Sequence, residues 1–369
     1  MTEDKATRYH RLRRRAEIAG LIWAAISAAA VLFSGAAAWV RDAASSLPAP
    51  GAAVPLVAAL LVGAYEIGAL PLAHYGWRLD RRYGLSHQPL RDWLADQAKG
   101  VAVGLVLAVV AAAVVYGAMV RFGARWWLAA GGVMALLVAV LATLAPVLLL
   151  PLFFRFRPLD RPALADRLRA LAEAAGTRVM GVYEWTLGSK TRRANAALAG
   201  IGATRRIIIS DTMLEQYSDD EIAVVLAHEL GHHVHHDIWR AIAMEAVIVL
   251  AGFYAAEVAL RAFGPALGLH GPADPAGLPL IALAAGAVSI GLTPLALALS
   301  RLHERRADRF ALELTGLPGA FVTAMRRLAA QNLAEERPSR LVRWLFHSHP
   351  PIEERIATAE RWKNERSVR

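Results

Sequence analysis

Six apolar segments, each long enough to cross a membrane as a helix, dominate this 369-residue sequence. A transmembrane helix needs about 20 mainly apolar residues. The segments that meet this requirement are Ala19–Val40, Ala52–His74, Val101–Val120, Trp127–Leu150, Ala241–Phe263 and Leu278–Leu299. Hydrophobic residues make up 56% of the chain and the mean hydropathy is +0.37, both high for a protein without a membrane domain. The sequence therefore predicts a mainly α-helical, polytopic membrane bundle with six spans.

The first apolar segment has an alternative interpretation as a cleaved signal peptide. The apolar part of a signal peptide runs over about 7–15 residues, whereas this segment is apolar for about 20 residues. We therefore expect an uncleaved membrane anchor at the N-terminus.

Positive charge follows the spans in a regular alternation. The net charge is +10, and arginine is dense in the N-terminal "RYHRLRRR" and after the second, fourth and sixth segments. The intervening loops are poor in cations, with no lysine or arginine between Pro265 and Gly277. Because cytoplasmic loops carry the excess of cations, both termini are predicted to be cytoplasmic, in a multi-pass protein of the cell membrane.

The basic balance does not indicate a nucleic-acid partner. The sequence shows no nucleic-acid-binding motif, and its arginine clusters lack interleaved aromatic residues. The cytoplasmic leaflet of a membrane is anionic, so basic loops that face this leaflet are sufficient to explain the positive net charge of the chain.

The spans divide the chain into four regions. Residues 1–150 form a membrane domain with four transmembrane helices, and residues 241–299 supply two more. Residues 151–240 are a polar catalytic region, and residues 300–369 are a polar tail that completes it. Both polar regions lie on the cytoplasmic side by the charge alternation, so we expect them to fold into one small α+β domain.

The region 151–240 contains an H-E-x-x-H motif in "VVLAHELGHHVHHD", Val224 to Asp237. "SDDE", Ser218 to Glu221, predicts a capping box that opens a helix. His228 and His232 are four residues apart on one face of that helix and can chelate one zinc ion. Glu229 is placed to act as general base toward a water. The alternative is a polar helix end that is rich in histidine by chance.

A catalytic zinc site takes three protein ligands, and the chain has no cysteine to supply one. "SRLHERRADRF", just beyond the sixth span, offers Glu304 as the third ligand. Asp308, one helical turn further on, is placed to hold the free ring nitrogen of a ligating histidine. The alternative is an interfacial charged helix whose acids pair with Arg301, Arg305 and Arg306.

The remaining polar residues of "VVLAHELGHHVHHD" are interpreted as a helix end. His233 lies about 100° around the helix from His232, away from the ligand face. His233, His235, His236 and Asp237 are therefore expected to form a polar patch at the membrane interface.

Several motifs, in order along the chain, resemble those of the integral-membrane zinc endopeptidases of the CAAX prenyl protease type, here in a bacterial form. The bacterial heat-shock membrane protease HtpX is a more distant relative. Besides "HELGH" and "SRLHERRAD", the motifs are "YGLSHQPLRDWLADQAKG" (Tyr83–Gly100), "PLFFRFRPL" (Pro151–Leu159), "GSKTRRANAALAG" (Gly188–Gly200), "RIIISDTML" (Arg206–Leu214) and "WLFHSHPPIEERI" (Trp344–Ile356).

The resemblance implies roles for three further residues. Asn195 would bind the backbone of a substrate peptide laid along an edge strand. His349 would stabilise the oxyanion of the reaction, and Arg355 would support that catalytic site. The chain departs from its eukaryotic counterparts in having "AALAG" where they carry aromatic residues, so its substrate subsites are expected to differ.

Together these features predict a membrane-embedded zinc metalloendopeptidase with one Zn²⁺ per chain. Its partners would be membrane-associated peptides or proteins, which it would cleave near the cytoplasmic face. One alternative is a six-span transporter with Glu66, Glu245 and Glu257 along its path. The other is a non-catalytic zinc scaffold, against which the intact general base Glu229 argues.

Overall fold

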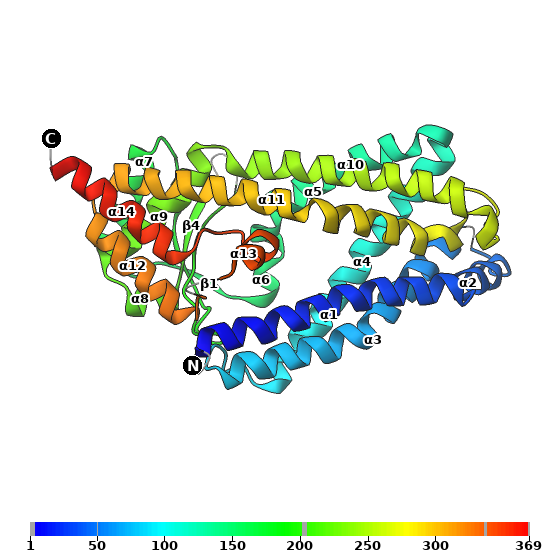
Figure 1. Ribbon diagram of the computed structural model, residues 1–369, viewed down its shortest axis with the longest axis horizontal. Coiled ribbons are helices and arrows are strands. Elements are labelled where there is room, and N and C mark those ends of the chain that lie inside the picture. Colours follow the sequence, from blue (N-terminus) through cyan, green and yellow to red (C-terminus); the bar gives the residue numbers. More distant parts are fainter. Residues whose placement is uncertain (1–3, 50, 201–204, 336–337, 368–369) are drawn as a thin grey trace.

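The computed structural model describes residues 4–49, 51–200, 205–335 and 338–367. Long helices run side by side through most of the molecule, and a small sheet with short helices lies at one end (Figure 1). Both ends of the chain lie at the end that carries the sheet. The predicted fold class, a membrane helical bundle with a small α+β domain, is confirmed.

The six apolar segments of the sequence correspond to six long helices. These are α1 (Lys5–Phe33), α3 (Ala53–Arg82), α4 (Leu90–Phe122), α5 (Trp126–Leu148), α10 (Asp237–Phe263) and α11 (Leu278–Thr315). By length and composition, five segments of the described chain are able to cross a membrane, and the one at Leu90–Leu144 contains both α4 and α5. A 3₁₀ turn, η1 (Gly123–Arg125), separates these two helices, which pack against each other.

The first predicted span, Ala19–Val40, is wrong in its C-terminal part. Helix α1 ends at Phe33, and Gly35 has a φ of 76°, a left-handed conformation that glycine adopts without steric cost. A separate short helix, α2 (Ala36–Ser45), follows. At its other end α1 is longer than predicted, because the arginine-rich segment after Lys5 is helical too.

Helices α10 and α11 also extend beyond their apolar parts toward the sheet. Helix α10 begins at Asp237, directly after the H-E-x-x-H helix, and α11 continues without a break through "HERRAD" to Thr315. The two helices lie side by side along the molecule (Figure 1). Close packing is possible where Gly252 of α10 faces Ala285 of α11, since a Cβ at Gly252 would lie 3.3 Å from that of Ala285. Helices α10 and α11 therefore each carry membrane-spanning residues and residues of the site.

The small sheet has four strands in the order β1-β2-β4-β3. They are β1 (Phe156–Pro158), β2 (Gly181–Trp185), β3 (Ala196–Ala199) and β4 (Arg206–Ser210). Strands β2 and β4 are parallel, while β1 and β3 pair antiparallel with their neighbours. Strand β3 is thus an edge strand, and it lies against helix α9 (Asp219–Val234), which carries the H-E-x-x-H motif.

Short helices complete this end of the molecule. They are α6 (Leu150–Phe153), α7 (Pro162–Ala174), α8 (Asp211–Gln216), α12 (Pro318–Gln331), α13 (Arg340–Phe346) and α14 (Ile352–Ser367). One apolar core joins α7, α8, α12 and α14 to the sheet, with Ile207 and Ile209 of β4, Leu226 of α9, Leu312 of α11 and Phe321 of α12 all fully buried. Because this core takes residues from before α10 and after the start of α11, the two polar regions of the sequence pack together.

Candidate active site

Helix α9 is held at its N-terminus by the capping box that the sequence predicts. Ser218 Oγ accepts a hydrogen bond from the Glu221 backbone N–H at 3.3 Å, and Glu221 Oε2 accepts one from the Ser218 N–H at 2.8 Å. Arg327 of α12 also donates to Glu221, at 2.9 Å. The buried apolar face of α9 then fixes its rotation, so that the histidines point toward α11.

His228, His232 and Glu304 bring three ligand atoms together at the contact between α9 and α11. The two Nε2 atoms lie 3.2 Å apart, and each lies 3.3 Å from an oxygen of the Glu304 carboxylate. The three ligand atoms all lie within 4.8 Å of one another. The predicted third ligand therefore comes from far along the chain to the face of α9 that carries the histidines.

The outward ring nitrogens of both histidines face carboxylates. His228 Nδ1 lies 2.9 Å from Asp308 Oδ1, and His232 Nδ1 lies 3.0 Å from Asp237 Oδ2. A carboxylate accepts but does not donate, so both Nδ1 atoms carry the proton and both Nε2 lone pairs face Glu304.

Three acceptors facing one another require a positive charge between them. Glu304 Oε2 is buried and finds no donor with hydrogen-bond geometry among the described residues. Burial lowers the pKa of His228, but its contacts with Asp308 and Glu304 outweigh this and raise it to about 9. Two imidazoles, each held by an outer carboxylate, together with the Glu304 carboxylate fit a divalent transition metal.

Asp237 is a site residue that the sequence interpretation missed. It was assigned to a polar helix end, but it is 5% exposed and holds His232 as Asp308 holds His228. His236, between α9 and α10, has a φ of 59°, and this left-handed turn folds Asp237 back toward α9. The signal in the sequence was an acid at the first position of the helix that follows the ligands.

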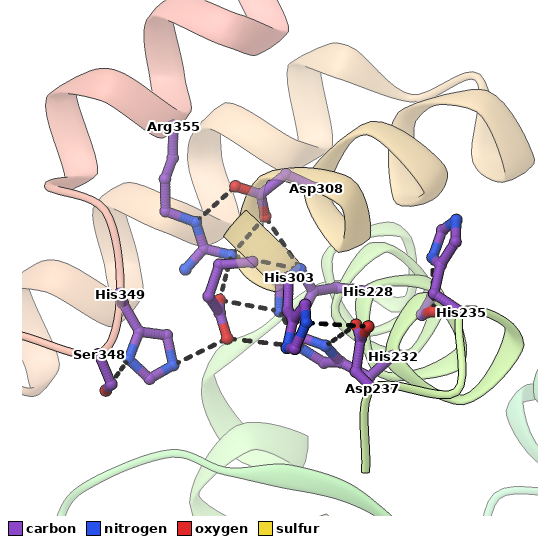
Figure 2. Close-up of polar contacts among 11 residues, drawn as sticks. His228, His232, His235, Asp237, His303, Asp308, Ser348, His349 and Arg355 are labelled. Atoms are coloured by element: carbon purple, nitrogen blue, oxygen red, sulfur yellow. Dashed lines mark hydrogen bonds and ion pairs between the residues drawn. The ribbon is translucent and has the colours of Figure 1, made fainter. Parts of the chain in front are cut away.

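Arg355 of α14 is largely buried and packs against Asp308 and His228. Its Nε donates to Asp308 Oδ2 at 2.9 Å and its Nη2 to Asp308 Oδ1 at 2.5 Å. The same Nη2 lies 3.3 Å from His228 Nδ1 and 3.9 Å from Glu304 Oε2. Burial lowers the pKa of this guanidinium, but the Asp308 charge outweighs burial and raises it. Helix α14 is thereby tied to α9 and α11 (Figure 2).

His349 lies on the open side of the site. Its Nε2 is 3.2 Å from Glu304 Oε1, and its Nδ1 is 2.8 Å from Ser348 Oγ. The side chain is 60% exposed, so it is free to meet a ligand that enters. The loop between α13 and α14 brings this residue next to the metal-ligand set.

Glu229 and Asn195 line the same cavity as His349. The cavity measures about 340 Å³, and its apolar wall includes Met213, Val225, Met325 and Leu328. No described residue forms a hydrogen bond or ion pair with the Glu229 carboxylate, and burial raises its pKa. Asn195 directly precedes edge strand β3, and its backbone N–H donates to Ser210 Oγ at 2.9 Å. Five of the eight site residues expected from the sequence line this cavity, namely Asn195, His228, Glu229, His349 and Arg355. The other three, His232, Glu304 and Asp308, each contact His228.

A divalent-cation site that joins an H-E-x-x-H helix to membrane-spanning helices defines an integral-membrane metallopeptidase. The chain belongs to peptidase family M48, whose profile matches residues 158–363. Residues 2–155 match the profile described as the CAAX prenyl protease N-terminal domain with five membrane helices. The predicted enzyme class is confirmed, and so is the family resemblance.

Known relatives extend over most of the chain. The "Uncharacterized metalloprotease YhfN" of Bacillus subtilis is 33% identical over 299 residues, which cover 80% of this chain and 70% of that protein. The "Probable CAAX prenyl protease 1" of Schizosaccharomyces pombe is 26% identical over 289 residues, covering 75% and 59%. The crystal structure of Ste24p from S. mikatae shares the fold, with a TM-score of 0.84 at 20% identity over 96% of this chain and 88% of that one.

Proposed function

We propose that this membrane metallopeptidase is a zinc-dependent endopeptidase that cleaves membrane-associated peptides or proteins near the cytoplasmic face of the cell membrane. The observation that carries the proposal is the convergence of His228, His232 and Glu304 beside the free carboxylate of Glu229. Nitrogen and oxygen ligands without a thiolate suit zinc in a catalytic site with three protein ligands. One Zn²⁺ per chain follows from the single set of ligands that the described residues contain.

Glu229 supplies the acid–base chemistry in this proposal. When bound, zinc would polarise the scissile carbonyl and activate a water. Burial raises the pKa of Glu229, so this carboxylate accepts a proton more readily than an exposed one does. It takes the proton of the attacking water and then delivers it to the leaving amine.

His349 stabilises the negative charge that develops on the carbonyl oxygen. Its Nε2 faces the ligand set from the cavity side, which is where that oxygen would lie. A donor aimed at developing charge lowers the barrier mainly in the transition state. Arg355 contributes indirectly, since it holds Asp308 and through it the ring of His228.

Asn195 and strand β3 bind the substrate backbone. Among the described residues no strand pairs with the outer edge of β3, so its backbone groups are available to an extended peptide. A peptide added there would run past α9 and the cavity. The alanines of β3 leave room for bulkier substrate side chains than aromatic residues would.

The cytoplasmic position of the site is supported by charge. The arginine-rich start of α1, the end of α3 with Arg81 and Arg82, and the sheet domain gather at one end of the molecule (Figure 1). Cations flanking spans favour the cytoplasmic side, so both termini are proposed to be cytoplasmic.

The family membership does not support the transporter alternative, and one intramembrane acid has a structural explanation. Glu257 of α10 is 5% exposed and accepts hydrogen bonds from Trp126 and Arg261. The Glu257 carboxylate therefore holds neighbouring side chains together at the end of the bundle far from the sheet.

Substitution of Glu229 tests the proposed function. Glu229→Gln in native membranes should keep the metal and trap bound peptides, whose sequences then define a fluorogenic substrate. On that substrate the variant should lose about 10²-fold or more in kcat, as expected for a lost general base. Glu215→Gln, an exposed acid on nearby α8, is the matched control. Hydrolysis by Glu229→Gln at the wild-type rate would exclude this mechanism.

A further inference from the structure

A buried arginine of α11, Arg301, lies one helical turn before the ligand Glu304. Arg301 is 8% exposed. Its Nη1 donates to two backbone carbonyls, Arg343 O at 3.2 Å and His347 O at 2.6 Å. No carboxylate of the described chain lies within 4.0 Å of this guanidinium. A buried charge without an ion pair is costly, so we expect Arg301 to have a role other than stabilising the fold.

The two carbonyls belong to the segment that carries His349. Arg343 is in the last turn of α13, where its carbonyl also accepts the backbone N–H of His347 at 3.3 Å. The His347 carbonyl lies just beyond the helix end, two residues before His349. One nitrogen of Arg301 therefore joins the end of α13 to the start of the His349 loop.

The His349 side chain has few other restraints. It is 60% exposed, and within the described chain its polar contacts are Ser348 and Glu304. The position of the imidazole thus depends on where the backbone of its loop is held.

Arg301 and Glu304 share one face of α11, because they are three residues apart in a continuous helix. The helix that presents the ligand Glu304 therefore also fixes the loop that presents His349. The position of the His349 imidazole relative to the metal-ligand set is therefore fixed. Catalytic donors have to be held to about 0.5 Å, which a backbone anchor of this kind provides.

We propose that Arg301 is a positioning residue that sets the place of His349 relative to the reacting carbonyl. The inference rests on the proposed function of His349 as an oxyanion donor. It goes beyond that function in assigning the placement of the donor to a buried arginine on a membrane-spanning helix.

A double-mutant cycle tests the proposal. Arg301→Met keeps the approximate length of the side chain and removes both hydrogen bonds to the carbonyls. It should lower kcat by about tenfold or more, but by no more than the loss of an oxyanion donor would. KM and metal content should stay near wild type. Combined with His349→Ala, the same substitution should cause no further loss of kcat, because it acts through His349. Arg301→Lys, which can still donate to both carbonyls, should restore most of the activity.

Hydrogen–deuterium exchange supplies a readout that does not depend on activity. Arg301→Met should speed exchange in residues 346–350 and leave α9 protected. Arg309→Met is the matched control, since Arg309 is on the same helix and among the described residues pairs with Glu313 alone, and it should change neither kcat nor exchange.

Three outcomes would overturn the proposal. An equal loss of kcat in the wild-type and His349→Ala backgrounds would make Arg301 a general structural residue. Loss of metal in Arg301→Met would show that it holds Glu304 instead. Unchanged kcat in His349→Ala would remove the role of His349 itself, while Glu229→Gln would separately report whether the proposed peptidase mechanism stands.

Discussion

Arg355 and Asp308 form a two-pronged ion pair, with Nε 2.9 Å from Oδ2 and Nη2 2.5 Å from Oδ1. The pair is buried, and the same Asp308 carboxylate fixes the ring of His228. A contact between α14 and α11 therefore controls the orientation of a ligand on α9. Removing one partner would leave the other charge buried and unpaired, so the pair is sensitive to substitution.

Metal content should follow the three ligands. His228→Ala and Glu304→Ala should each lose most of the bound zinc, because three protein ligands are needed for a catalytic site. Glu229→Gln should keep about one zinc per chain, since Glu229 lies outside the ligand set. Elemental analysis of purified protein measures this. Full retention of zinc in both ligand variants would refute the assignment of the site.

The two outer carboxylates should contribute to zinc affinity to a similar degree. Asp308→Asn and Asp237→Asn should each weaken zinc binding by roughly 10–100-fold, because each holds the proton-bearing nitrogen of a ligand. Competition with a chelator of known affinity measures the change. Asp166→Asn, an exposed acid paired with Arg169, is the control. An unchanged affinity in Asp237→Asn would return Asp237 to the role of a helix-end residue.

The substitutions His349→Ala and Asn195→Ala should affect different kinetic constants. His349→Ala should lower kcat by roughly 10²–10³-fold, about 3–4 kcal/mol, with little change in KM or zinc. Asn195→Ala should raise KM more than it lowers kcat, because backbone binding stabilises the ground state as well. Steady-state kinetics on one peptide, with zinc measured on the same samples, separates the two. Near wild-type kcat in His349→Ala would remove this residue from the mechanism.

Cysteines at Ala273 and Ser339 should be labelled from opposite sides of the membrane. Both positions are exposed, and the natural chain has no cysteine to give a background. The loop with Ala273 lacks lysine and arginine, so it should react with an impermeant reagent from outside. Ser339 should react only after the membrane is opened. Labelling of both from the same side would contradict the proposed topology.

The capping box of α9 should make stability depend on pH. Burial raises the pKa of Glu221, but the Ser218 N–H and the contacts from Arg327 and Thr323 outweigh it and lower the pKa. A lowered pKa means that the stabilisation is present above the unfolded pKa and is lost as pH falls through the folded value. Glu221→Gln should therefore cost about 1 kcal/mol at pH 7 and almost nothing at an acid pH below the folded pKa. Melting temperatures at both pH values test this, and an equal difference at both would contradict it.

The sequence predicted those parts of the site that depend on local periodicity. His228 and His232 were placed by helical spacing, and Glu304 and Asp308 by the same spacing on a second helix. Asp237 was misassigned because its role depends on a left-handed turn at His236, which the pattern of histidines did not reveal. The break at Gly35 was missed for a similar reason, since apolar composition continues across it while the backbone turns.

The residues tied to the site through tertiary contacts required either the family resemblance or the structure. His349 and Arg355 lie more than 100 residues from the H-E-x-x-H motif, and no spacing rule links them to it. Arg301 entered the sequence analysis only in the alternative in which the acids of this helix pair with its arginines, and in the structure it donates to carbonyls of α13 and its following loop. Such contacts depend on how α13 docks against α11, which is decided by packing.

Helix α11 runs unbroken from Leu278 to the ligand Glu304, over 26 residues. At about 1.5 Å per residue this distance is about 39 Å, compared with about 30 Å for the hydrocarbon core of a bilayer. A membrane span and a metal ligand on one helix move together, so the proposed reaction would take place at a fixed distance from the bilayer. A substrate anchored in the same bilayer would then be cut at a bond selected by its distance from the anchor, in addition to its local sequence.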